Sequence, residues 1–109
     1  MEFDKDTQKK IKELQNYEQN LHNLLIQKQA FEIELVESEN AYNEVSKSTE
    51  DIHRLVGNIL IKTDKKKVQE ELKKRKDLIT LRIKSIETQE SVISRQLEEL
   101  KKDVLSKIK

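Results

Sequence analysis

One potential helix breaker stands near the middle of this chain. Gly57 is the only glycine among 109 residues, and proline is absent. Because these two residue types most often interrupt helices, their scarcity predicts two long helices joined at a single turn. We therefore expect one mainly α domain over residues 1–109, with helices at 1–49 and 65–109 and a short connection at 50–64.

Apolar residues recur at alternating intervals of three and four along both predicted helices. In residues 14–45, and again in residues 72–104, eight of the ten repeat positions are apolar. A repeat that continues for more than four heptads is typical of a coiled-coil seam. The predicted core residues are Leu14, Leu21, Leu24, Phe31, Leu35, Leu72, Ile79, Ile83, Ile86, Ile93, Leu97 and Leu100.

We expect the two helices to pair with each other in antiparallel orientation. Parallel pairing between two chains is the alternative, but a connection of about twenty residues makes folding back easier. Facing residues of an antiparallel pair have numbers that add to a constant, and a sum of 114 places Leu21 opposite Ile93 and Lys28 near Glu90. A sum of 121 would bury Glu90 against Phe31, and this unfavourable burial of a charge favours 114. Each arm would then span roughly 45 residues and about 65 Å.

The connection has the pattern of a β-hairpin. Two runs rich in β-branched residues flank Gly57-Asn58, and glycine at the first central position suits a two-residue type II′ turn. This turn would place Val56 opposite Ile59 and would fix the pairs that follow.

A hairpin of this kind predicts oligomerisation. An isolated two-stranded ribbon is marginally stable in water and leaves both edges unpaired. Because the helix seam is already occupied, we expect several copies to join their hairpins in a shared β-barrel; a collapsed loop lying on the helices is the alternative. The residues expected to mediate oligomerisation are Ile52, Leu55, Val56, Gly57, Asn58, Ile59, Leu60 and Ile61.

The composition argues against an enzyme and against a nucleic-acid-binding arm. Residues 1–51 carry twelve acidic and six basic side chains, whereas residues 52–109 carry nine and sixteen. This asymmetry suggests that the two halves lie against each other, and no aromatic residues interleave with the basic ones to stack on bases. His22 and His53 lack partners at catalytic or metal-binding spacing, and one glycine cannot form a phosphate-binding loop. We expect no cofactor.

The sequence also indicates a cellular compartment. Cysteine is absent, and no segment approaches the ~18 apolar residues of a membrane span. The start, MEFDKDTQKK, lacks the hydrophobic core of a secretory signal. These features predict a soluble protein of the reducing cytoplasm without membrane association.

The segment RLVGNILIKT at residues 54–63, followed by a helix, resembles the β class of the prefoldin family. The flanking heptads extend this resemblance over nearly the whole chain. A single hairpin matches the β class, because the α class has a longer linker with two hairpins, and the short chain is similar to the archaeal form. The resemblance implies an ATP-independent chaperone, a hexamer of two α-type and four β-type subunits joined by β-barrels. It also implies capture of unfolded proteins at the coiled-coil tips and their transfer to a group II chaperonin.

The free helix ends carry apolar residues that the predicted seam leaves uncovered. A sum of 114 makes Lys10 with Val104 and Thr7 with Lys107 the outermost layers, so we expect the seam to open before the helices end. Exposed apolar groups on frayed, charged helices suit weak contact with many unfolded sequences. Simple fraying is the alternative, and a structural or tethering coiled coil without clients would then be the function. The predicted client-binding residues are Phe3, Ile11, Val104, Leu105 and Ile108. Apolar residues off the seam, for which the sequence leaves contact with clients or with neighbouring subunits open, are Ile26, Ile33, Leu78 and Leu81.

Overall fold

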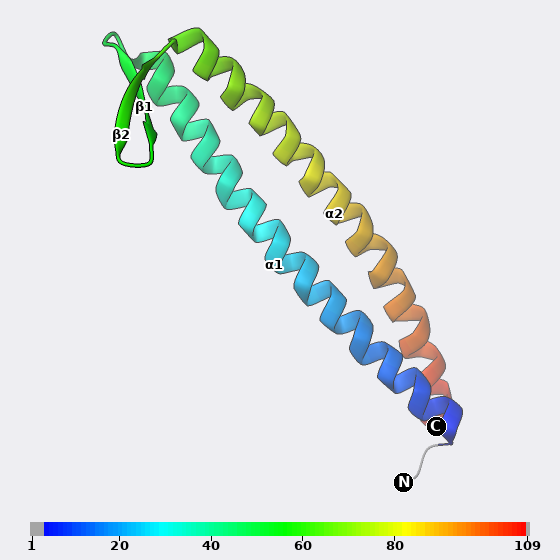
Figure 1. Cartoon of the computed structure of the whole chain (residues 1–109). Coiled ribbons are helices and arrows are strands. Elements are labelled where there is room, and N and C mark those ends of the chain that lie inside the picture. The colour runs from blue at the N-terminus through cyan, green and yellow to red at the C-terminus, as the bar shows by residue number, and fades with distance from the viewer. Residues whose placement is uncertain (1–3, 109) are drawn as a thin grey trace. The chain divides into compact units, whose positions relative to one another are not determined.

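The computed structural model describes residues 4–108. In chain order its elements are helix α1 (Lys5–Lys47), strand β1 (Ile52–Val56), strand β2 (Ile59–Thr63) and helix α2 (Lys65–Ile108) (Figure 1). The predicted architecture of two long helices and one antiparallel hairpin is confirmed. The first helix ends two residues earlier than predicted, at Lys47.

The described chain divides into two compact units. One contains the residues up to Gln29 together with those from Lys84 onward, and we call it the terminal unit. The other, Ala30–Ile83, contains both strands, and we call it the hairpin unit. Each unit includes part of α1 and part of α2, so each has its own stretch of paired helices.

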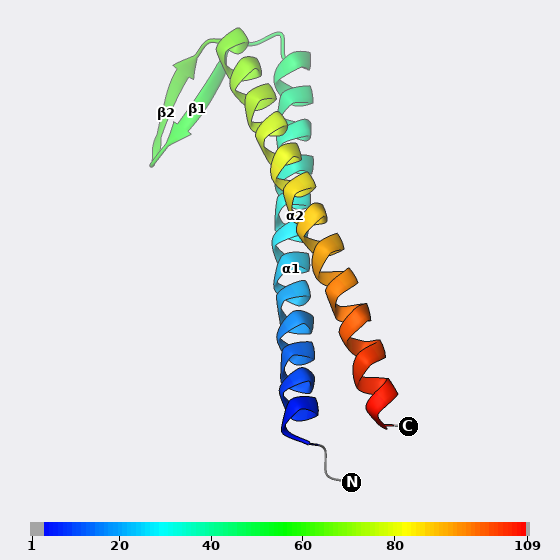
Figure 2. The same ribbon diagram turned by 90° about the vertical axis from the view of Figure 1, so that its right-hand side faces the viewer.

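In the hairpin unit, α1 and α2 run antiparallel beside each other (Figures 1 and 2). Ile79 and Ser38 are its most deeply buried seam residues, 3% and 6% exposed. The Arg82 guanidinium lies 5.8 Å from the centre of the Phe31 ring, a cation–π distance that ties the two helices together. The numbers of these two residues add to 113, one less than the predicted constant.

In the terminal unit, the buried seam residues include Leu24, Ile86 and Leu97. An ion pair between Lys28 and Glu90 joins the helices in the same unit, as expected for residues that the predicted register places in neighbouring layers. In both units the predicted core residues are buried or half-buried. Eight further predicted core residues are half-buried: Leu14, Leu21, Phe31, Leu35, Leu72, Ile83, Ile93 and Leu100.

The hairpin has the predicted register and turn. Its strand pairs run from Ile52 opposite Thr63 to Val56 opposite Ile59. Gly57 has a φ of +61°, and no other described residue has a positive φ. Since Asn58 therefore has a negative φ, the turn meets the type II′ requirement for a positive value at the first central position alone.

Side chains cap both helices where they begin. The Thr7 amide donates to Asp4 Oδ1 at 2.7 Å, so Asp4 is the N-cap of α1. The Lys66 amide donates to Asp64 Oδ1 at 3.3 Å, which makes Asp64 the N-cap of α2.

The end of α1 is capped from the second helix. Lys65, the first residue of α2, donates from Nζ to the carbonyl oxygens of Ser46 at 3.1 Å and Ser48 at 2.9 Å. Carbonyls near a helix C-terminus lack intrahelical partners and favour a nearby cation. This contact gives a lysine at the start of α2 a structural role, although its own helix dipole disfavours a positive charge there.

Candidate assembly and client-binding sites

The hairpin displays an unusually apolar surface for its size. Leu55 and Leu60 pair directly across the strands, and each is 67% exposed. On the opposite face, Val56 pairs with Ile59 and Ile61 lies beyond them, and these three side chains are 50–67% exposed. Isolated surface leucines are ordinary, whereas a cluster of this kind marks an interaction site.

The strand edges add hydrogen-bonding capacity to this surface. The sheet of the described chain has two strands only, so β1 and β2 each keep one edge without a neighbouring strand. Free backbone groups on an edge can pair with a strand of another chain. The hairpin therefore combines apolar faces with two open edges, the chemistry needed to join a larger sheet.

An ion pair joins the hairpin to a helix. Arg54 of β1 pairs with Glu71 of α2, whereas Lys62 of β2 lies 3.2 Å from Asp51 in the connection that precedes β1. Ile52 is half-buried beside a cavity of about 440 Å³ between the hairpin and the helices. Figure 2 shows the rest of the ribbon standing clear of α1 and α2. The alternative of a loop collapsed on the helices does not fit this arrangement.

The seam of the terminal unit stays closed farther than predicted. Thr7 is 2% exposed and Val104 is 5% exposed, so both are core residues of the last layers. The expectation that Val104 lies uncovered is wrong for this chain. The physical reason is that Thr7 presents a small side chain to the seam while its amide is bonded to the Asp4 carboxylate.

Four charged residues close the same end of the terminal unit, and we call them the terminal clasp: Asp6, Lys10, Asp103 and Lys107. Asp6 Oδ2 lies 3.3 Å from Lys10 Nζ and 2.9 Å from Lys107 Nζ, and Lys10 also bonds to Asp103. Hydrogen bonds from Lys107 and Lys10 lower the pKa of the Asp6 carboxyl below its ordinary value of 3.8. The bond to Asp103 raises the pKa of Lys10 above its ordinary value. The Asp6 carboxylate and the Lys10 ammonium are therefore held in their charged forms at neutral pH.

The other predicted client-binding residues differ in their surroundings. Leu105 is 55% exposed and Ile11 is half-buried. Phe3 and the side chain of Ile108 lie outside the described residues. At the free ends, Leu105 is thus the predicted residue that the structure leaves open to solvent. The off-seam residues are exposed by 51–64%: Ile26, Ile33, Leu78 and Leu81.

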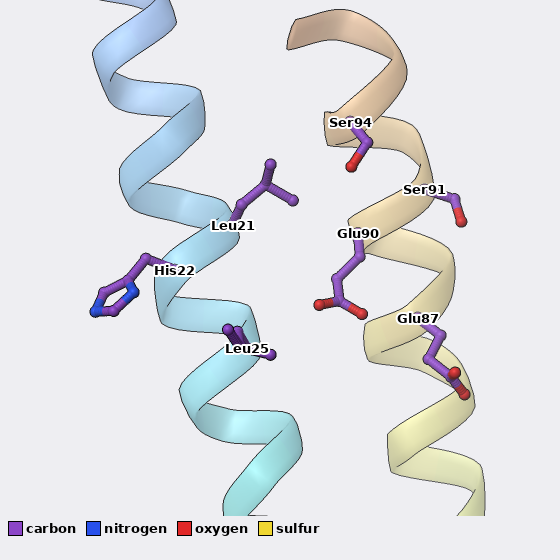
Figure 3. Close-up of a pocket in the computed structure, with 7 residues that line it drawn as sticks. All are labelled: Leu21, His22, Leu25, Glu87, Glu90, Ser91 and Ser94. Atoms are coloured by element: carbon purple, nitrogen blue, oxygen red, sulfur yellow. The ribbon is translucent and has the colours of Figure 1, made fainter. Parts of the chain in front are cut away.

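A groove of about 730 Å³ runs between α1 and α2 in the terminal unit. Figure 3 shows Leu21 directed toward α2, Glu90 directed toward α1, and His22 directed away from the facing helix. Ser91 and Ser94 line the α2 side, where their small side chains leave the space unfilled. Glu90 is already paired with Lys28, so the groove offers no convergent pair of free titratable groups for acid–base chemistry.

Between residues 4 and 108, no three His, Cys, Asp or Glu side chains gather as a metal ion would need. Over the same range, neither helix is long and apolar enough to cross a membrane.

Reasoning from the sequence missed the terminal clasp and the Lys65 cap. The sequence does contain a signal for the clasp. The residue numbers of Lys10 and Asp103 add to 113, as do those of Asp6 and Lys107, and this sum is one less than the predicted constant of 114. Applying the constant-sum rule to charged residues as well as to the core would have found them. The Lys65 cap depends on the path that the chain takes between α1 and α2, and no residue pattern in the sequence predicts it.

Comparison with known proteins gives a consistent result. The profile of a family described as "Prefoldin subunit" matches residues 8–109. A "Prefoldin subunit beta" of Saccharolobus islandicus is 37% identical over 97 residues, which cover 87% of this chain and 77% of the relative. One from Thermococcus onnurineus is 37% identical over 90 residues, covering 81% and 78%.

Solved structures agree with the sequence relatives. The crystal structure of the prefoldin beta subunit from Thermococcus strain KS-1 superposes with a TM-score of 0.87 at 29% identity, covering 96% of this chain and 94% of that one. The beta2 subunit from the same strain, 19% identical, shares the fold with a TM-score of 0.69 over 80% of this chain and 95% of its own.

Proposed function

The chain belongs to the prefoldin family, whose members are chaperone subunits rather than enzymes, and from this premise we propose that it works in an ATP-independent holding chaperone. It would assemble in the cytoplasm with α-type subunits and further copies of itself into a hexamer, through its hairpin. The assembly would capture unfolded proteins at the helix ends and pass them to a group II chaperonin.

The observation that carries this proposal is the pair Leu55 and Leu60. Both side chains are two-thirds exposed on a ribbon that stands clear of its own helices and keeps two open edges. Burying a leucine side chain is worth roughly 1.5–3 kcal/mol. A shared barrel formed by several hairpins would bury these residues and would pair the free strand edges in one step.

Assembly is tested by placing charges on the hairpin. Leu55→Asp with Leu60→Asp should release helical hairpin monomers or dimers, because unpaired carboxylates are unfavourable inside a barrel. The matched control is Val36→Asp with Val92→Asp, two exposed apolar residues of the helices away from the hairpin. Sedimentation velocity reports the assembly state, and circular dichroism reports helicity. A hairpin variant that remains fully assembled would contradict the shared barrel.

Capture at the helix ends has separate support. Leu105 offers an exposed apolar side chain there, and the adjoining turns are rich in lysine, which keeps the surface hydrated between encounters. Several weak apolar contacts, one on each arm of an assembly, can add up to useful affinity through multivalency. No step of this mechanism requires a nucleotide.

The test is light scattering from a denatured client diluted into buffer, with this protein and its α-type partner and without nucleotide. The full-length assembly should suppress aggregation. Deleting residues 1–10 and 103–109 should abolish the protection while leaving assembly intact, because the strands belong to the hairpin unit. Equal protection by the truncated and full-length proteins would place capture elsewhere.

The second candidate is a structural or tethering coiled coil that binds no client. The burial of Thr7 and Val104 favours it, since this end of the seam is closed by its own residues. The same light-scattering assay separates the two functions, because a tether would not protect clients at any concentration that permits assembly.

A further inference from the structure

Two residues of the terminal clasp, Asp6 and Asp103, are adjacent in sequence to the most buried residues near the free ends, Thr7 and Val104. Lys10 and Asp6 come from the first turns of α1, and Asp103 and Lys107 come from the last turns of α2. These turns lie at the same end of the terminal unit (Figures 1 and 2). Val104 is buried, and it is adjacent in sequence to exposed Leu105.

We propose that the terminal clasp is a gate: its ion pairs keep the helix ends together over Val104, and clients bind when the ends separate. This inference rests on the proposed capture at the helix ends and adds its regulation. With the clasp closed, the exposed Leu105 side chain can contact a client, whereas the buried Val104 side chain cannot. With the clasp open, Val104 and the remainder of half-buried Ile11 become available as well. The open ends therefore present more apolar surface to an unfolded chain.

The exposure of the clasp suits a gate that opens often. The clasp side chains are 61%, 44%, 36% and 25% exposed for Asp6, Asp103, Lys107 and Lys10, whereas Lys28 and Glu90 in the same unit are 21% and 20% exposed. Solvent-exposed ion pairs are individually weak and are screened by salt. The outer pairs can thus break and reform while the inner pair maintains the register.

The consequence for capture follows from population shift. A client that binds the open ends draws the equilibrium toward them, and weakening the clasp raises the open population before the client arrives. Loss of one exposed ion pair changes such an equilibrium by roughly 1.5- to 5-fold. Changes of this size are measurable in a capture assay at a client concentration below saturation.

The first test neutralises the clasp without removing an apolar side chain. Lys10→Gln with Asp103→Asn should increase capture of a denatured client by the assembled protein roughly two- to fivefold. The amides near Val104 should exchange hydrogen faster. The matched control, Lys9→Gln with Glu98→Gln, changes two exposed charges that form no ion pair with the described residues and should leave both readouts unchanged. Unchanged capture and exchange in the clasp variant would overturn the gate.

The second test locks the gate. The chain has no native cysteine, so Lys10→Cys with Asp103→Cys can be bridged selectively by a short bismaleimide containing a reducible disulfide. The bridged assembly should lose most of its capture, and reduction should restore capture to at least the wild-type level. Sedimentation of both forms verifies that assembly is unaffected.

The outcomes separate the gate from the proposed function. If the bridged form captures clients as well as the reduced form, while deletion of residues 1–10 and 103–109 abolishes capture, the gate is wrong and capture at the ends stands. If the deletion also leaves capture unchanged, capture at the ends is wrong and the gate fails with it.

Discussion

Lys28 Nζ lies 2.8 Å from Glu90 Oε1, with the two side chains only 21% and 20% exposed. Both residues occupy positions of the heptad repeat that are otherwise mostly apolar. Sliding one helix along the other would leave each charge half-buried without its partner, which is strongly unfavourable. The pair therefore selects one register among those that the apolar repeat alone would allow.

This relationship predicts coupling between the two residues. Lys28→Glu or Glu90→Lys alone should reduce the free energy of unfolding by on the order of 2 kcal/mol, because each places like charges together in the seam. The double reversal should recover part of that loss. Urea denaturation of the four proteins completes the cycle. A coupling energy near zero would show that the pair does not define the register.

Lys65 provides a second test, on the C-terminal cap of α1. Lys65→Met removes the donor to the Ser46 and Ser48 carbonyls and should reduce stability by about 1 kcal/mol. Neighbouring Lys66 has an exposed side chain, and its bond to Asp64 comes from the backbone. Lys66→Met is therefore a matched control and should have almost no effect. Thermal unfolding checks the prediction, which fails if both variants behave alike.

Stability of the terminal unit should depend on pH in the acid range. Hydrogen bonds from Thr7 lower the pKa of Asp4, and hydrogen bonds from Lys107 and Lys10 lower the pKa of Asp6, in each case below the ordinary 3.8. The unfolded chain therefore binds more protons than the folded chain between the lowered pKa values and 3.8. The stabilisation is complete above pH 3.8 and is lost as the pH falls through the lowered values.

The measurement for this prediction is hydrogen exchange or helicity at the start of α1 during acid titration. Asp6→Asn should flatten the part of the profile below pH 3.8, because its side chain cannot titrate. Glu13→Gln, at an exposed position with no ion pair among the described residues, should leave the profile as it is. If the Asp6→Asn profile is identical to that of the wild type, Asp6 does not contribute to the pH dependence of stability.

Gly57 tests the turn of the hairpin. Its φ is +61°, and an added Cβ would have no heavy atom within 4 Å. Any penalty for substitution is therefore conformational rather than steric. Gly57→Ala should reduce hairpin stability by about 1 kcal/mol, Gly57→Val should reduce it more, and Gly57→Asn should be tolerated best, because asparagine adopts left-handed conformations more readily. Assembly midpoints from dilution should follow the same order.

Most of the fold could be predicted from the sequence because its determinants are local or periodic. The heptads define both helices, Gly57 identifies the turn, and the turn type determines every strand pair down to Ile52 with Thr63. The constant sum of 114 places Lys28 and Glu90 in neighbouring layers, close enough to form the observed ion pair. These features depend on the spacing of residue types along the chain, which can be read directly from the sequence.

The free ends were predicted less well, for a physical reason. A heptad pattern treats Thr7 as a polar interruption, yet its small side chain is buried at 2% exposure. Burial there depends on the neighbouring cap and on ion pairs that cross between helices, so it is a cooperative property of the folded end. The same reasoning explains why Val104 was predicted to be exposed and is not.

Leu105 gives the sharpest test of where clients bind. It is 55% exposed near the end of α2 and belongs to no buried layer, so Leu105→Gln should leave stability within about 0.5 kcal/mol of the wild type. If clients contact the helix ends, each assembled arm loses one apolar contact, and protection in the light-scattering assay should fall several-fold because the arms act together. Val92→Gln is the matched control, since Val92 is 49% exposed on the same helix within the terminal unit but lies farther from its end. Equal loss in both variants would mean that capture uses exposed apolar residues along the arm rather than at its end, and no loss in either would remove Leu105 from the client-binding surface.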